Sequence, residues 1–439
     1  MVCDGSRPFA FLFHHRSGWE SKTMISFGLV AAIILTGLAV LAVWQFQPCL
    51  KGLRGALAAD QAASQDYSPA ARVILCLRGA DPFLDRCLRG LVNQDYPEYK
   101  VLIVVDSPTD SAVPQVESLL REYGADCAEM IVRDRILPRC SRRASSLFCG
   151  LNQVPTEVQV VVMCDADAIP HRTWLRELVT PLAEPLTVAT SGNRWYAPLS
   201  LTMGGLCRYY WNALAFRAMH QYQIPWCGSL AMRGDLFRDP QFLDCLQHAF
   251  SEDTALAGYL MNKAQQAKPI VSLIVLNEET IGLKNFWGFL VRQMLAARLN
   301  HPHWPTIFVE AMAILVVMWI LLPLSIMEGT SSLAWWCAGA VIYDGIVLAT
   351  IGHFEWLVRR HLWQSRDQRV SPIDWKRFCL APIGLSLTGF IYPLAVLSAV
   401  SATRHEWRGI VYRIERRGVS TLYEREAFNS LPANQFESV

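Results

Sequence analysis

Two carboxylates, Asp165 and Asp167, stand one residue apart directly after the apolar run 158–163. Mg²⁺ and Mn²⁺ take oxygen ligands, commonly one or two carboxylates together with the phosphates of a substrate. An Asp-x-Asp sequence is usually a solvated turn, because so short a pattern often occurs by chance. Its place at the end of a strand-like run favours the other interpretation, in which one carboxylate approaches a divalent cation and the other reaches a ribose or a bridging water.

A second acidic pair, Glu252 and Asp253, follows Ser251 at the start of the amphipathic stretch 254–261. Ser251 is a plausible N-cap, and acids in the first helical turn suit the helix dipole, so ordinary helix capping explains the pair. A carboxylate at this point could also act as the general base that removes a proton from an attacking hydroxyl. The two interpretations are compatible.

Five strand-like apolar runs must position these residues, and helical stretches separate them. The runs are residues 73–77, 101–105, 158–163, 186–190 and 270–276. Such alternation predicts an α/β fold with a mostly parallel sheet. Ligands bind such sheets at the carboxyl ends of the strands. Acids follow the first two runs at these ends, namely Asp81, Asp106 and Asp110.

The N-terminal region contains an apolar segment long enough to cross a bilayer. No residue from 23 to 50 is charged, and residues 25–46 have the length of about 20 residues that a transmembrane helix needs. A cleaved signal peptide is the alternative, but its apolar core should be only about 7 to 15 residues long. Residues 1–24 are then an N-terminal tail, or an overextended start with Met24 as the true initiator.

Three further apolar segments, residues 307–327, 333–351 and 378–400, predict a C-terminal transmembrane region over residues 307–401. Glu310 and Asp344 lie inside or near the ends of the first two segments. An ionisable group there must face protein or water, and a packing role is favoured for both residues.

Basic residues indicate on which side of the membrane each part lies. The loop before the last segment contains Arg359, Arg360, Arg366, Arg369, Lys376 and Arg377. Positively charged loops favour the cytoplasm, which also places residues 51–305 there. The basic tail, residues 402–439, then falls on the opposite side, against the rule. Either the last segment, interrupted by Pro382 and Pro393, re-enters without crossing, or the tail is an exception.

Composition supports a membrane protein and excludes other classes. Hydrophobic residues make up 52% of the 439 residues and charged residues only 18%, and the net charge of +2 predicts no binding of nucleic acid. The 13 cysteines include no CxxC pair, which argues against a disulfide framework and a structural zinc site. A reducing, cytosolic setting fits better.

In their order along the chain these motifs resemble family 2 glycosyltransferases, and within them the membrane enzymes similar to ceramide glucosyltransferase. The resemblance rests on Leu77-Arg78-Gly79-Ala80-Asp81-Pro82, Asn93-Gln94-Asp95-Tyr96-Pro97 and Val101-Leu102-Ile103-Val104-Val105-Asp106, followed by the Asp165 pair and Asp253. It implies a GT-A type nucleotide-sugar-binding domain over residues 51–305, with one transmembrane helix before it and about three after it. Trp407-Arg408-Gly409 in the tail also resembles the end of lipid-linked members.

The resemblance also implies roles for individual residues. Leu77, Gly79 and Arg143 would belong to the donor site, and Asp106 would contact its uracil or ribose end. Asp165 and Asp167 would hold Mg²⁺ or Mn²⁺ and the diphosphate. Asp253 would be the base, supported by Glu252, and the acceptor side would include Gly228 and Ser229.

The closing motif of the family, Gln or Arg, two residues and then Arg-Trp, is incomplete in this chain. Gln293 keeps the leading position, but Ala296 and Ala297 replace the Arg-Trp pair. That pair normally helps to hold the diphosphate and the acceptor. Arg292, Gln293 or Arg298 must therefore substitute for it, or the activity is altered.

The function predicted from these features is transfer of a hexose from a UDP-sugar to a membrane lipid by an inverting, metal-dependent transferase with a cytoplasmic catalytic domain. A processive polysaccharide synthase would need a translocation channel and usually a complete closing motif. A protein of the same fold that binds a nucleotide without catalysis is favoured by the missing Arg-Trp pair, but the intact Asp165, Asp167 and Asp253 oppose it.

Overall fold

The computed structural model describes residues 25–58, 67–124, 126–366, 368, 370–372, 374–415 and 418–424. The predicted N-terminal tail, residues 1–24, lies outside these ranges, and so does Arg369 of the basic loop. All structural statements below concern the described residues.

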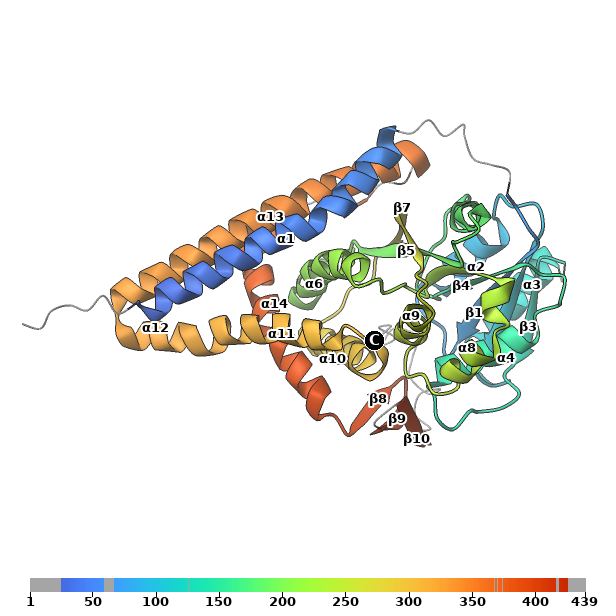
Figure 1. Ribbon diagram of the computed structural model, residues 1–439. Coiled ribbons are helices and arrows are strands. Elements are labelled where there is room, and N and C mark those ends of the chain that lie inside the picture. Colours follow the sequence, from blue (N-terminus) through green and yellow to red (C-terminus); the bar gives the residue numbers. More distant parts are fainter. Residues whose placement is uncertain are drawn as a thin grey trace, which may run out of the picture.

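A seven-stranded sheet forms the centre of the large domain (Figure 1). Its strands are β1 (Ala71–Leu77), β2 (Tyr99–Val105), β3 (Ala128–Val132), β4 (Val160–Cys164), β5 (Ala189–Tyr196), β6 (Ser229–Arg233) and β7 (Lys268–Asn277). Their order is β3-β2-β1-β4-β6-β5-β7, and only β6 runs antiparallel to its neighbours. The mostly parallel sheet confirms the predicted α/β fold class.

Helices cover both faces of this sheet because its strands are apolar on both sides. In β1, Val73 and Leu75 pack on one face and Ile74 on the other. The first face is covered by α2 (Leu84–Val92), α3 (Val113–Tyr123) and α5 (Trp174–Val179). The second face is covered by α4 (Arg142–Asn152), α8 (Pro240–Leu246) and α9 (Glu252–Asn262). Runs that are buried on both faces are typical of parallel sheets. Two short helices, η1 (Thr180–Ala183) and α7 (Gly234–Phe237), complete the connections.

Two strands and one strand boundary differ from the sequence-based expectation. The predicted run 186–190 lies mostly before β5, which begins at Ala189, and Leu186 is 88% exposed. Strands β3 and β6 were not predicted, since each has only five residues and a charged residue among them. The apolar pattern of such short segments is weak.

Four helices are long and apolar enough to cross a membrane. They are α1 (Phe27–Ala58), the continuous helix formed by α11 (Trp304–Leu315), η2 (Val316–Leu321) and α12 (Leu322–Glu328), then α13 (Thr330–Arg366) and α14 (Trp375–Ser401). Helices α1 and α13 lie side by side (Figure 1). A Cβ added at Gly339 would lie 2.4 Å from Cα of Ala32, so a glycine is needed where the two backbones approach closely.

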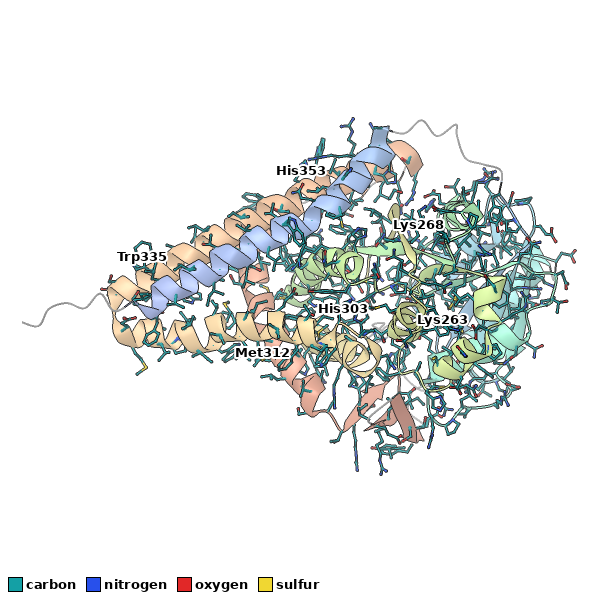
Figure 2. The ribbon with its side chains drawn as sticks, in the orientation of Figure 1. Lys263, Lys268, His303, Met312, Trp335 and His353 are labelled. Atoms are coloured by element: carbon teal, nitrogen blue, oxygen red, sulfur yellow. The ribbon has the colours of Figure 1, made fainter. Side chains whose placement is uncertain are left out.

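Large apolar side chains cover the outside of these helices. Figure 2 shows Trp335 and Met312 on the helices that extend away from the domain, and Lys263 and Lys268 on the domain itself. Trp335 is 51% exposed and Val341 is 72% exposed. An exposed apolar surface of this kind suits contact with lipid.

Helix α14 begins and ends at the large domain, and it crosses the other long helices obliquely in Figure 1. Near its start, Arg377 Nη2 donates to the carbonyl oxygen of Pro198 at 2.5 Å. After its end the chain enters a small sheet that is docked on the domain, where Arg408 Nη1 donates to the carbonyl oxygen of Arg78 at 2.7 Å. Both ends of α14 are therefore fastened to the domain.

The small sheet occupies residues predicted only as part of a basic tail. Its antiparallel strands are β8 (Arg404–Trp407), β9 (Ile410–Glu415) and β10 (Gly418–Glu424). Arg408 and Gly409 join β8 to β9 with φ values of 46° and 75°, as a two-residue hairpin turn requires. The sheet packs against α10 (Leu283–Asn300) and α14, and α6 (Met203–Gln221) packs beside both helices.

Candidate active site

A pocket rich in arginine lies at the carboxyl ends of β1, β2 and β4. Its charged lining consists of Arg78, Arg142, Arg143, Arg194, Arg292 and Arg408 with Asp81, Asp106, Asp165 and Asp167. We call it the arginine pocket. Six arginines against four aspartates leave an excess of positive charge, which suits an anionic ligand.

Asp165 and Asp167 follow β4, and each faces a different arginine. Oδ1 of Asp165 lies 2.5 Å from Nη1 of Arg143, and Oδ2 accepts from Trp226 Nε1 at 3.1 Å. Oδ2 of Asp167 accepts from Asn277 Nδ2 at 2.9 Å and lies 3.4 Å from Nη1 of Arg194. The strand therefore brings both carboxylates to the wall of the arginine pocket.

The two carboxylates differ in charge state. Burial raises the pKa of Asp165, but Arg143 and Arg194 outweigh burial, so the net shift is downward. Burial raises the pKa of Asp167 to about 6, because Arg194 opposes this shift only in part. At neutral pH both side chains are mainly ionised, as cation ligands must be.

Asp253 forms the second acidic pair with Glu252, and both lie in the first turn of α9. Its Oδ1 accepts from the backbone N–H of Cys227 at 2.7 Å. Burial, and then the negative charge of Glu252, raise the pKa of Asp253 to about 7. Glu252 is itself held by the guanidinium of Arg143, which also pairs with Asp165. Arg143 therefore connects the start of α9 to the end of β4.

An apolar cavity of about 210 Å³ opens between the domain and the long helices. Helices α1, α6, α10, α11, α13 and α14 line it, with Trp211, Leu214, Met294, Ala296, Ala297 and Ile307 among the apolar residues. Glu310 and Asp344 also line it, and each accepts a hydrogen bond, from Tyr222 and Ser386 respectively. We call it the apolar cavity, and Ser251, Asp253 and Thr254 are also among its lining residues.

A third hollow joins the other two. It shares Arg143, Asp165, Arg194, Arg292 and Trp407 with the arginine pocket. It shares Trp211, Met219, Ser251, Asp253, Gln293 and Ala296 with the apolar cavity. We call it the junction. Asp253 therefore stands where the apolar cavity and the junction meet.

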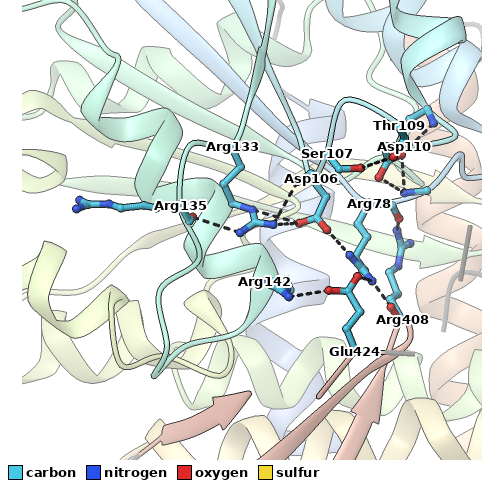
Figure 3. Close-up of polar contacts among 12 residues, drawn as sticks. Arg78, Asp106, Ser107, Thr109, Asp110, Arg133, Arg135, Arg142, Arg408 and Glu424 are labelled. Atoms are coloured by element: carbon cyan, nitrogen blue, oxygen red, sulfur yellow. Dashed lines mark hydrogen bonds and ion pairs between the residues drawn. The ribbon is translucent and has the colours of Figure 1, made fainter. Parts of the chain in front are cut away.

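Most of the residues predicted for a site are brought together here. Leu77, Asp106, Arg143, Asp165, Asp167 and Arg292 line the arginine pocket, while Glu252, Asp253 and Gln293 line the junction. Asp106 pairs with Arg78 and Arg133, and Nη2 of Arg133 lies 2.6 Å from its Oδ1 (Figure 3).

Four predicted residues do not line any of the three hollows. Gly79 has a φ of 79° and donates its N–H to Asp110, so it shapes the turn after β1. Ser229 accepts from Trp174 Nε1 at 2.8 Å inside the sheet layer, and Gly228 packs behind Asp165. Arg298 Nη1 donates to the carbonyl oxygen of Ala399 at 2.6 Å, which fastens α10 to the end of α14.

Several lining residues were not predicted. Arg194 lies in β5, beyond the run 186–190 that the sequence predicts as a strand, so the sequence pattern does not place it in the site. Trp407 and Arg408 come from the small sheet, and the only sequence signal at this point is the resemblance of Trp407-Arg408-Gly409 to the end of lipid-linked members of the family. No local pattern indicates that they reach the carboxyl edge of a sheet more than 200 residues earlier in the chain.

Residues 72–226 match the family model described as Glycosyl transferase family 2. A ceramide glucosyltransferase of Komagataella phaffii is 36% identical over 47 residues, which cover 11% of this chain and 9% of that relative. A Pyrobaculum calidifontis mannosyltransferase, solved with GDP-Man and Mn²⁺, has 16% identity and a TM-score of 0.49, covering 85% of this chain and 99% of its own. The S. aureus protein TarS has 12% identity and a TM-score of 0.32, covering 80% of this chain and 60% of its own.

The matched segment contains β1 to β5 and both acids of the Asp165 pair. With the mostly parallel sheet, this match supports a domain of glycosyltransferase type in this part of the chain. Over residues 72–226 the chain carries a glycosyl transferase family 2 domain, as its motifs predicted.

Proposed function

We propose that this protein transfers a hexose from a UDP-sugar to a hydroxyl group of a membrane lipid, with inversion at the anomeric carbon. The observation that carries the proposal is the continuous path from the arginine pocket through the junction to the apolar cavity, with Asp253 at its acceptor side. Each part suits one component of this reaction.

The arginine pocket suits the nucleoside diphosphate of the donor. Asp106 lies at the end of β2, where a carboxylate can accept hydrogen bonds from a ribose or a base. Arginine is well matched to phosphate, because its planar guanidinium donates two parallel hydrogen bonds. Developing charge on the departing diphosphate would be stabilised by these fixed donors.

Asp165 and Asp167 are the residues that would hold Mg²⁺ or Mn²⁺. The described residues contain no group of three or more acidic, His or Cys side chains around a common point. Mg²⁺ is commonly bound by only one or two carboxylates, with substrate phosphates completing its shell, so this pair fits. When bound, the cation would supply positive charge to the leaving diphosphate.

Asp253 would remove the proton from the acceptor hydroxyl. The acceptor oxygen forms a bond to the anomeric carbon of the sugar, and the bond from that carbon to the diphosphate oxygen breaks. The electron pair of that bond leaves with UDP, and the hydroxyl proton goes to Asp253. A base on the apolar cavity side and a leaving group in the arginine pocket place attack and departure on opposite sides, which produces inversion.

The apolar cavity suits the lipid acceptor. Its lining is mainly aliphatic and aromatic, and it lies between helices whose outer surfaces are apolar. An acceptor could keep its chains among these helices while its hydroxyl reaches Asp253. The similarity to a ceramide glucosyltransferase supports a lipid acceptor.

The membrane arrangement belongs to the same proposal. Residues 25–46 and 307–401 would hold the membrane part, and residues 51–305 the catalytic domain. The basic residues beside α13 and α14 support a cytoplasmic position for that domain.

One observation favours a second candidate, a nucleotide-binding protein without catalysis. Ala296 and Ala297 stand where the family has Arg-Trp. A processive polysaccharide synthase is less well supported, since the mainly aliphatic and aromatic lining of the apolar cavity beside Asp253 suits a lipid better than a growing polysaccharide.

The test is release of UDP from a panel of UDP-sugars by the full-length protein in detergent with Mn²⁺ and a mixed lipid extract. We expect one sugar to be turned over, with a new glycolipid as product, and Asp253→Asn to abolish turnover. Asp235→Asn is the matched control, because Asp235 is exposed and lies outside the three hollows. If UDP binds but no donor is turned over, the second candidate is correct.

A further inference from the structure

Arg292 lies one helical turn before Ala296, the position at which the family places its arginine. Residues four apart share one face of a helix, so a long side chain at 292 can reach the space that a side chain at 296 would occupy. Arg292 lines both the arginine pocket and the junction. Arg298, the other arginine nearby, is turned toward α14 instead.

Trp407 reaches the same place from the small sheet. The guanidinium carbon of Arg292 lies 4.8 Å from the centre of the Trp407 ring, which is a cation–π contact. Trp407 also lines both the arginine pocket and the junction. Its ring packs edge-on against Phe250, 6.0 Å away, directly before the segment that carries Glu252 and Asp253.

Both side chains keep a buried donor without a hydrogen-bond partner. These donors are Nε of Arg292 and Nε1 of Trp407. Leaving a buried donor unpaired costs free energy, so two of them at one pocket wall indicate a ligand that accepts hydrogen bonds. Burial also lowers the pKa of Arg292 to about 10, and the charges of Arg194 and Arg408 add to this effect. An anion in the pocket would relieve that repulsion.

We propose that Arg292 and Trp407 together replace the missing Arg-Trp pair, so that a helix and a distant strand jointly bind the diphosphate of the nucleotide sugar. The small sheet is then part of the donor site. This inference rests on the proposed function only for the identity of the donor.

Ion pairs and hydrogen bonds fasten the small sheet at this position (Figure 3). Arg408 Nη2 donates to Oδ1 of Asp81 at 2.7 Å, and the carboxylate of Glu424 pairs with Arg78 and Arg142 at 2.7 and 2.8 Å. The hydroxyl of Tyr412 accepts from the backbone N–H of Arg142 at 3.0 Å. These contacts hold Trp407 against the pocket, so its ring is prepositioned before a ligand binds.

The replacement also explains the two alanines. Ala296 lines the apolar cavity and the junction, and Ala297 lines the apolar cavity. The carbonyl oxygen of Ala296 accepts from Thr254 Oγ1 at 2.9 Å, so α10 lies tightly against α9 here. A tryptophan at 297 would fill space that the apolar cavity uses. A tryptophan at residue 407 therefore provides an aromatic ring to the donor site and leaves the apolar cavity at full width beside Ala297.

The experiment measures nucleotide binding by calorimetry on the full-length protein in detergent with Mn²⁺. UDP, GDP and CDP are titrated first, and the tightest diphosphate is compared with its nucleoside. We expect Arg292→Ala and Trp407→Ala each to weaken diphosphate binding by about tenfold or more, as loss of a charge-assisted hydrogen bond does, and to leave nucleoside binding unchanged. Trp407→Phe, which keeps a ring but loses the N–H, should fall between wild type and Trp407→Ala.

Two further variants separate ligand binding from a merely structural role. Adding Ala296→Arg to Arg292→Ala returns a guanidinium to the same helical face and should restore diphosphate binding. Arg404→Ala and Trp375→Ala are matched controls, because both side chains are exposed and lie outside the pocket. The double variant Arg292→Ala/Trp407→Ala should lose less than the sum of the single effects, because the pair acts as a unit.

Diphosphate affinities within twofold of wild type in both single variants would overturn the proposal, and so would a wild type that binds none of the three diphosphates. Loss of nucleoside binding to the same extent as diphosphate binding would also overturn it. A different result would contradict the proposed function without contradicting this inference. If diphosphate binding depends on Arg292 and Trp407 but no lipid is glycosylated, the pair is correct and the reaction is wrong.

Discussion

Oδ2 of Asp165 lies so close to Gly228 that a Cβ atom at residue 228 would be only 2.2 Å from it. The same oxygen accepts a hydrogen bond from Nε1 of Trp226. The backbone N–H of Asp165 donates to the carbonyl oxygen of Gly228 at 3.2 Å. The loop before β6 therefore closes directly against the end of β4. Glycine at 228 is required for this contact, and its role is to position Asp165.

Gly228→Ala should displace Asp165 and weaken donor and metal binding by at least about tenfold, with a loss of stability of about 1–3 kcal/mol from steric overlap. Calorimetric titration of UDP with Mn²⁺ and a thermal melt check both effects. Gly55→Ala is the control, since a Cβ there meets nothing within 4 Å. If Gly228→Ala binds UDP with the affinity of wild type, the backbone near residue 228 can shift to accommodate the Cβ atom, and the prediction is wrong.

The transfer rate should depend on the ionisation of Asp253. A base works only when deprotonated, and burial together with the charge of Glu252 raises its pKa to about 7. We therefore expect kcat to fall about tenfold per pH unit below this value and to level off above it. A pH–rate profile at saturating donor and acceptor tests this. A rate that stays constant between pH 5 and pH 7 would assign the proton transfer to another group.

The same pKa has a consequence for stability. Because the folded-state pKa is raised, the protonated carboxyl is favoured in the folded protein, and this contribution is lost as pH rises through about 7. Asp253→Asn removes the cost of the buried charge and should stabilise the protein at pH 8 by about 1 kcal/mol or more. At pH 4 the difference should disappear. Thermal melts at both pH values measure it, and equal shifts at both would contradict this explanation.

Ala297→Trp should block the acceptor side alone. The new ring would enter the apolar cavity that Ala297 lines, so we expect the KM for the lipid to rise about tenfold or more while UDP affinity stays unchanged. Val341→Trp is the control, because Val341 is 72% exposed on the outer surface of the long helices. An unchanged lipid KM would mean that the acceptor binds elsewhere.

Removal of divalent metal should abolish donor turnover. With EDTA, the diphosphate would have to bind beside Asp165 and Asp167 without a cation to offset their charge. We expect activity to return with Mn²⁺ or Mg²⁺, and Asp167→Asn to raise the metal concentration required for half-maximal activity about tenfold. Full activity in EDTA would assign charge neutralisation to the arginines alone.

The central strands and the acid pairs could be predicted because their signals are local. Val160 to Cys164 are all buried in β4, and the Asp165 pair follows at once. Ser251, Glu252 and Asp253 likewise stand together at the start of one helix.

The remainder of the candidate site depends on contacts between distant parts of the chain. Trp407 and Arg292 are separated by more than 100 residues and meet only after the small sheet docks. Arg194 enters the pocket from β5, whose polar residues hide its strand pattern. The periodicity of apolar residues describes one helix or strand at a time, so it does not predict contacts between side chains of distant elements.

The small sheet is the last described part of the chain to be synthesised, since residues 404–424 follow all four apolar helices. During translation the pocket that receives Trp407, Arg408 and Tyr412 therefore stays open on one side until those helices have left the ribosome. A nascent chain cannot complete this pocket before its four apolar helices are made. In the proposed membrane arrangement, completion of the pocket would follow insertion of these helices into the bilayer, because the small sheet comes after them in the chain.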